Sequence, residues 1–176
     1  MALTKLNNQS LSAVTAAGIP IRGGSVVQVK HAVNNTKITK TSTSFVDSGL
    51  FTGVTFDNNL QANSKVFATV EATIGEAQSS SWAYPFVLTL YEGSTNIGTD
   101  ANGGLCGSIA VINGNNGNDI YGMERVYGSI LYTPSSTNPS YKLYVKSVSG
   151  TFDRVVGGSV NIQAGGTRIT LMEIAG

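Results

Sequence analysis

The feature that most restricts the fold is a two-residue alternation of apolar and polar side chains, which recurs in short segments after the first 24 residues. The clearest case is SKVFATVEATIG, where Val66 and Val70 fall on one face and Thr69 and Glu71 fall on the other. A period of two is typical of a β-strand with one face against a core, whereas an amphipathic helix repeats every 3.6 residues. The alternation therefore predicts strands.

Clusters of turn-forming residues separate the alternating segments. TDANGG, NGNNGND and TPSSTNPS are rich in residues that tolerate a positive φ or bond their own backbone, so each favours a chain reversal. About ten short strands with no convincing helix between them indicate an all-β antiparallel β-sandwich of the jelly-roll type. We expect this β-sandwich over residues 25–176 and a short N-terminal arm over residues 1–24.

One predicted strand, YPFVLTLYEG, carries bulky apolar side chains on both of its faces. Such a strand is typically covered on both sides. A lone sandwich would leave the second face in water, so we expect another subunit to cover it. The residues that we assign to this subunit interface are Phe86, Leu88, Leu90 and Tyr91.

The charge balance and the reactive residues argue against several classes of function. Eleven Lys and Arg residues against ten Asp and Glu residues give a formal charge of +1, which provides no basic surface for nucleic acid. No apolar run approaches the roughly 18 residues of a membrane span, so we expect no membrane insertion. His31 and Cys106 are single residues of their types and far apart, which argues against a zinc site, and no nucleophile motif accompanies His31. We expect no cofactor, no metal and no enzymatic activity.

Aromatic residues beside polar loops favour contact with a sugar, because a ring can stack on a pyranose while amides and carboxylates bond its hydroxyls. The simpler interpretation of Trp82 is that it closes one end of the core or packs against a neighbouring subunit. A carbohydrate-binding module is therefore the alternative function, and a sandwich-fold glycan hydrolase with paired carboxylates is a distant third. The residues that we assign to glycan or receptor contact are Trp82, Tyr84, Asp100, Asn102, Asn115 and Tyr121.

The first residues, MALTKLNNQSLSAVTAAGIPIRGG, contain apolar side chains but no continuous apolar run. A secretory signal needs 7 to 15 such residues in sequence, so we expect no export signal here. Gly18 and Pro20 would end any helix at once. We interpret the segment as an attachment arm, and its apolar contact residues would be Leu3, Leu6, Leu11, Val14 and Ile19.

Four segments, in order along the chain, resemble a family of small virion proteins of tailed phages, especially marine and cyanobacterial ones. They are ALTKLNNQSLSAVTAAGIP, TKITKTSTSFVDSGL, SKVFATVEA and the terminal ITLMEI. In that family a leader similar to LTKLNNNSLSAVT precedes a β-domain with segments similar to STSYVDTGL and SKVLV. Residues 79–139 have no specific match.

The resemblance implies a non-enzymatic structural protein of the tail-fibre, knob or head-decoration type. It also implies a jelly roll similar to those of the C1q and tumour-necrosis-factor type, which usually form homotrimers. The expected partners are two further copies of the chain, other virion proteins bound through the N-terminal arm, and a glycan or protein of the host surface. The expected location is the virion, after assembly in the host cytoplasm.

Overall fold

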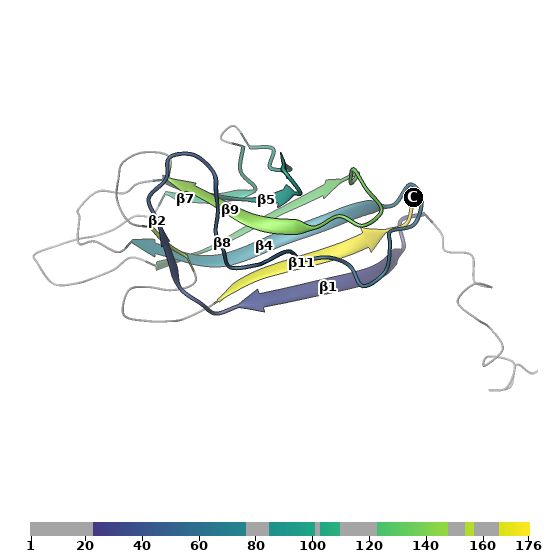
Figure 1. Ribbon diagram of the computed structural model, residues 1–176, viewed down its shortest axis with the longest axis horizontal. Coiled ribbons are helices and arrows are strands. Elements are labelled where there is room, and N and C mark those ends of the chain that lie inside the picture. The colour runs from purple at the N-terminus through teal and green to yellow at the C-terminus, as the bar shows by residue number, and fades with distance from the viewer. Residues whose placement is uncertain (1–22, 77–84, 101–102, 110–122, 148–153, 157–165) are drawn as a thin grey trace, which may run out of the picture.

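The structure is a computed structural model, and it describes residues 23–76, 85–100, 103–109, 123–147, 154–156 and 166–176. Every regular element in these ranges is a β-strand, and every pairing between strands is antiparallel. The strands form two sheets, which lie as two layers (Figure 1).

We call the larger one sheet A. Its strand order is β1, β11, β4, β10 and β2, and β8 pairs with the other side of β4. Both β11 and β10 pair with β4. On their far sides, β11 pairs with β1 and β10 pairs with β2. Because β8 covers the other edge of β4, the sheet is four strands wide. Its strands are β1 (Val26–Asn34), β2 (Ile38–Lys40), β4 (Lys65–Glu76), β8 (Met123–Tyr132), β10 (Arg154–Val156) and β11 (Thr167–Ile174).

We call the second one sheet B. Its order is β3, β9, β5 and β6, and β7 also pairs with β5. The chain alternates between the two sheets, since β3, β5 to β7 and β9 are in sheet B while the strands between them are in sheet A. This alternation confirms the predicted antiparallel β-sandwich of the jelly-roll type. The strands of sheet B are β3 (Val46–Asp47), β5 (Pro85–Glu92), β6 (Thr95–Asn96), β7 (Cys106–Ile109) and β9 (Tyr141–Ser147).

The hydrophobic core lies between the sheets. The even-numbered residues of β4, from Val66 to Ile74, are at most 2% exposed, as the alternation predicts. They belong to the same buried cluster as Leu143 and Val145 of β9. Burying an aliphatic side chain of this kind contributes about 1.5–3 kcal/mol to folding, so this cluster is the main stabilising element of the domain.

Strand β5 differs from the prediction in what covers its two faces. Leu88 and Leu90 are fully buried in the core between the sheets, so they cannot form the subunit interface that we assigned to them. Tyr91 is partly exposed and stacks on Tyr144 of the same chain. Phe86 lies in β5, but its side chain is outside the part that the structure describes.

The second face of β5 is covered by the chain itself. Val87 and Thr89 are 4% and 0% exposed, although they point away from the core. Gly104 lies against the Val87 side chain, and Gly98 lies against the Thr89 hydroxyl. The residues after β6 therefore fold back over the outside of sheet B, and only glycines permit this close approach.

The N-terminal end of β1 and the C-terminal end of β11 meet at one end of the sandwich. The backbone N–H of Gly24 donates to the Ala175 carbonyl at 2.8 Å, and the Ala175 N–H donates to the Ser25 carbonyl at 2.9 Å. The C-terminus of the chain lies at this same end (Figure 1). We call it the terminal end of the domain.

A buried carboxylate ties three segments together at the terminal end. Glu173 is fully buried, and its Oε1 accepts hydrogen bonds from the Gln61 backbone N–H at 2.7 Å and from the Ser64 hydroxyl at 2.6 Å. Its Oε2 accepts from the Gln28 Nε2 at 2.7 Å. Three donors compensate for the loss of hydration that burial imposes on the carboxylate.

Candidate interaction surface

The candidate site is the outer face of sheet A, which points away from sheet B. The registers of β1, β11, β4 and β8 place its side chains in cross-strand rows. One row is mainly apolar, the next is polar, and the third is mainly charged or aromatic. In strand order the rows are Val29, Met172, Phe67 and Leu131; then His31, Thr170, Thr69 and Ser129; then Val33, Arg168, Glu71 and Tyr127.

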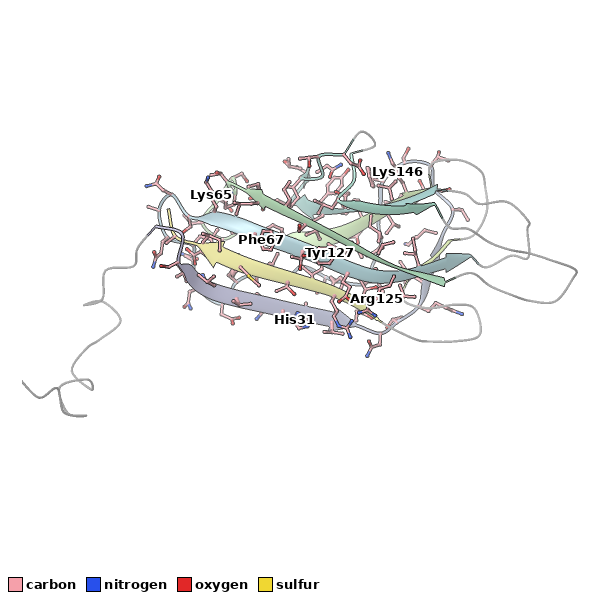
Figure 2. The ribbon with its side chains drawn as sticks, turned by 180° about the vertical axis from the view of Figure 1, so that it is seen from behind. His31, Lys65, Phe67, Arg125, Tyr127 and Lys146 are labelled. Atoms are coloured by element: carbon pink, nitrogen blue, oxygen red, sulfur yellow. The ribbon has the colours of Figure 1, made fainter. Side chains whose placement is uncertain are left out.

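The two edge strands of this face expose large hydrophobic side chains. Val29 of β1 is 53% exposed, Leu131 of β8 is 52% exposed and Tyr127 is 63% exposed. Val26 and Val33 of β1 are similarly exposed. Figure 2 looks onto this face, with Phe67 and Tyr127 labelled along β4 and β8. An apolar surface that spans several strands is typical of a contact with another protein.

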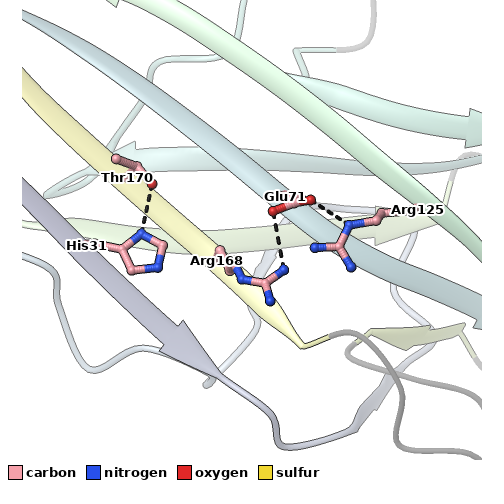
Figure 3. A network of polar contacts seen from close by, with 5 residues as sticks. All are labelled: His31, Glu71, Arg125, Arg168 and Thr170. Atoms are coloured by element: carbon pink, nitrogen blue, oxygen red, sulfur yellow. Dashed lines mark hydrogen bonds and ion pairs between the residues drawn. The ribbon is translucent and has the colours of Figure 1, made fainter.

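The charged row centres on Glu71. Its Oε1 accepts a hydrogen bond from the Arg125 Nε, and its Oε2 lies 3.3 Å from the Arg168 Nη1 (Figure 3). The hydrogen bond from Arg125, aided by the positive charges of both arginines, lowers the pKa of the Glu71 carboxyl, although partial burial acts in the opposite direction. Glu71 is therefore ionised at neutral pH. Partly exposed ion pairs of this kind contribute about 0–1 kcal/mol each to stability, so the network orients side chains more than it stabilises the fold.

His31 belongs to the polar row. Its Nδ1 lies 2.9 Å from the Thr170 hydroxyl, and the imidazole is exposed (Figure 3). Within the ranges that the structure describes, no group of three His, Cys, Asp or Glu side chains could hold a metal ion. In those same ranges no helix is long and apolar enough to cross a membrane. The face can bind by apolar contact at one end and by ion pairs at the other.

Most of the residues predicted to contact a glycan lie outside the described residues: Trp82, Tyr84, Asn102, Asn115 and Tyr121. The exception is Asp100, whose Oδ1 accepts a hydrogen bond from the Gly104 N–H at 2.6 Å. Asp100 thus holds the turn that covers Val87. The arm residues Leu3, Leu6, Leu11, Val14 and Ile19 also lie outside the described part of the chain.

The apolar row of sheet A was not among the predicted sites. Its sequence signal is Phe67, a large apolar residue on the polar side of an otherwise alternating strand. Leu131 is likewise a large apolar residue on the exposed side of its strand, β8, and it pairs with Phe67. Neither residue identifies the face alone, because the row exists only once the register of four strands is known.

Comparisons with known proteins find likeness only among solved structures. No protein-family model matches the chain, and no curated protein matches it. The structure is similar to that of Eiger TNF from S. frugiperda, at 12% identity and a TM-score of 0.44, over 88% of this chain and 94% of that one.

Two virus structures are also similar. The infectious bursal disease virus VP2 subviral particle gives 11% identity and a TM-score of 0.33, over 84% of this chain and 38% of that one. The Gx strain of the same virus gives 16% identity and a TM-score of 0.33, over 84% and 37%. The chain thus spans well under half the length of these virus proteins. The jelly-roll assignment for this chain rests on its own strand order.

Proposed function

We propose that the protein is a non-enzymatic structural protein of a tailed-phage virion, of the tail-fibre, knob or head-decoration type, and that it acts as a homotrimer. The sequence resemblance supports the virion role, because its segments include the leader, β2, β3 and parts of β4 and β11. The observation that carries the proposed assembly is the exposed apolar surface on the outer face of sheet A.

The physical argument for assembly concerns the cost of leaving this face in water. Each large apolar side chain contributes about 1.5–3 kcal/mol when it passes from full exposure to full burial. Val29, Leu131 and Tyr127 keep about half or more of their surface exposed, so covering them would recover a substantial part of that energy. In a closed ring of copies, the same free energy of burial is gained at every interface. This gain opposes the entropic cost of association.

The proposed attachment uses the N-terminal arm. Since Gly24 is hydrogen-bonded to Ala175, the described part of the chain begins at the terminal end, and the arm would join it there. The apolar row of the outer face is nearer to that end than the charged row, because the Val29–Met172 pair is closer to Gly24 and Ala175 than the Val33–Arg168 pair is. An arm that binds a particle here would leave the opposite end of the domain pointing outward.

The test is the solution mass of the full chain, measured by sedimentation equilibrium and native mass spectrometry. The expected mass is three times the 18.3 kDa of one chain. Leu131→Ser combined with Phe67→Ser should shift the protein to monomer at micromolar concentration, because both changes remove apolar contact surface. Asn59→Ser, at an exposed loop position, is the control and should stay trimeric. A wild-type protein that remains monomeric at these concentrations would rule out the proposed assembly.

The virion role needs a separate experiment. Labelled antibody against the chain, imaged on phage particles by electron microscopy, should decorate a tail appendage or the head surface at regular positions. Particles without label would contradict the role even if the protein is a trimer. A carbohydrate-binding module is the alternative function, and a cluster of aromatic side chains on sheet B favours it.

A further inference from the structure

The outer face of sheet B carries a cluster of aromatic and charged side chains, which we call the aromatic patch. It consists of Phe45, Asp47, Tyr91, Lys142, Tyr144 and Lys146. They come from three segments that are far apart in the sequence. The register brings them together, since Tyr144 of β9 pairs with Asp47 of β3 on one side and with Thr89 of β5 on the other.

The aromatic rings of the patch are arranged around Tyr91. The Tyr91 and Tyr144 rings stack with their centroids 3.8 Å apart and their planes at 21°. The Phe45 ring meets Tyr91 edge-on, with a centroid distance of 6.3 Å and an angle of 64°. All three side chains are partly exposed rather than buried. The outer face of sheet B therefore presents aromatic carbon to the solvent at a fixed place.

Charged groups surround these rings. The Lys142 Nζ lies 3.0 Å from the Asp47 Oδ2, and this hydrogen bond raises the pKa of the Lys142 amine. The Lys146 Nζ lies 4.5 Å above the centroid of the Phe45 ring. Lys142 and Lys146 are two residues before and after Tyr144 on the same strand, so their side chains lie on the same face as its ring. Donors and an acceptor thus border the aromatic surface.

Hydrogen bonds order the residues that adjoin the patch. The Asn96 Oδ1 accepts from the Thr89 hydroxyl at 2.6 Å, and the Asn96 Nδ2 donates to the Gly103 carbonyl at 2.7 Å. Gly103 in turn lies against Phe45, because a Cβ added there would be 3.4 Å from the Phe45 Cε2. A ligand would lose less free energy on binding to a surface that is already ordered.

We propose that the aromatic patch binds a hexopyranose residue of a surface glycan. The apolar C–H face of a pyranose ring matches an aromatic surface of this size, and its hydroxyls match a border of ammonium and carboxylate groups. Lys142 and Lys146 would donate to sugar oxygens, and Asp47 would accept from a hydroxyl. The patch differs from the residues that the sequence suggested for glycan contact, and it lies on the sheet opposite the proposed assembly face.

This inference goes beyond the structural role and does not depend on it. Saccharide binding can be measured on a monomer or a trimer, since sheet B is not part of the proposed interface. Loss of the trimer would therefore leave the expected binding unchanged. Loss of saccharide binding would leave the expected mass unchanged, so the two proposals fail separately.

The experiment uses the full chain and saturation-transfer NMR at millimolar methyl β-D-galactopyranoside, methyl β-D-glucopyranoside and N-acetylglucosamine. We expect transfer to the ring protons of at least one probe, and backbone amide shifts confined to β5, β9 and residues near Phe45. No transfer from any probe, or shifts that map to sheet A, would overturn the proposal.

The variants separate stacking from a structural effect. Tyr144→Ala should weaken binding of the responsive probe at least tenfold, while Tyr144→Phe, which keeps the ring, should change it less than threefold. If Tyr144→Ala does not fold, Tyr144→Ile keeps a strand-forming side chain without a flat ring and should show the same loss. Lys142→Met should weaken binding several-fold, whereas Lys30→Met, which breaks the matched exposed ion pair with Asp57, should not. Equal binding by wild type and by the folded variants without the Tyr144 ring would contradict the proposal.

Discussion

At the residue scale, Thr167 is an unusual position in the core. It is fully buried at the start of β11, and its hydroxyl is the one buried side-chain polar atom of the described residues without a hydrogen-bond partner. Burying a hydroxyl with no partner costs about 1–3 kcal/mol in proteins. Valine has the same shape and a high preference for strands.

We therefore predict that Thr167→Val raises the free energy of unfolding by about 1 kcal/mol. Urea denaturation at neutral pH, followed by circular dichroism, would measure the change. Thr170→Val is the matched control on the same strand, since the Thr170 hydroxyl contacts His31 and is partly exposed. A lower stability for Thr167→Val would indicate that this hydroxyl has a partner in solution.

Residue burial also shows where sequence patterns succeed and where they fail. The even positions of β4 are buried as predicted, because a period of two requires only that one face of the strand meets a core. Glu173 occupies a buried position of β11 that no pattern would assign to a carboxylate. Its burial depends on donors from Gln28, Gln61 and Ser64, and only the tertiary fold brings these together.

At the element scale, a pair of tyrosines joins the two sheets. The hydroxyl of Tyr132, on β8, donates to that of Tyr141, on β9, at 2.6 Å, and the two rings meet edge-on. Burial is the main cause that raises the pKa of both phenols above the usual value, and the negative charge of Glu92 acts in the same direction. Both tyrosines therefore stay protonated in the folded state at a pH where they ionise in the unfolded chain.

This difference in protonation between the folded and the unfolded state determines how stability changes with pH. Above about pH 10 the unfolded state has lost protons that the folded state still binds, so stability falls as the pH rises, by up to about 1.4 kcal/mol per pH unit for each tyrosine. We predict that urea unfolding at pH 8 and pH 11 shows this loss, and that Tyr132→Phe combined with Tyr141→Phe reduces it. An equal loss in the wild type and the double variant would contradict the assignment.

The elements that surround β5 explain why Leu88 and Leu90 are not available for the predicted interface. Its two apolar faces were recognised correctly from the alternation of Leu88 and Leu90 with Val87. The residues after β6 were read only as a turn, but they fold back because Gly98 and Gly104 allow close contact with β5. The aromatic patch escaped prediction for a similar reason, since Phe45, Tyr91 and Tyr144 become neighbours only through the strand register.

At the scale of the whole molecule, the features occupy separate parts of the sandwich. The outer face of sheet A carries the exposed apolar row, and the outer face of sheet B carries the aromatic patch. The described part of the chain begins at the terminal end, where Gly24 is hydrogen-bonded to Ala175. In the proposed function, assembly, glycan contact and attachment would use these three regions without competing for surface. Each can then be removed without disturbing the other two.

The arm gives the sharpest test of this separation. The β-sandwich begins at β1 and its terminal end is closed by hydrogen bonds of Gly24 and Ser25 with Ala175, so deleting residues 1–22 removes none of the described contacts. We predict that the truncated protein keeps its melting temperature within about 2 °C, which corresponds to less than about 1 kcal/mol for a domain of this size. It should also remain a trimer, because the proposed interface lies on sheet A.

The truncated protein should nevertheless fail to enter particles when it replaces the full chain during phage growth, as measured by quantitative mass spectrometry of purified virions. Replacing Leu3, Leu6 and Leu11 by serine should reduce incorporation in the same direction, since an apolar arm binds through these side chains. Lys5→Ala, within the same segment, serves as the control and should be incorporated normally. Normal incorporation of the truncated chain would show that the β-sandwich alone makes the attachment, and the exposed row of Phe67 and Leu131 would then become the surface to examine for contact with the particle.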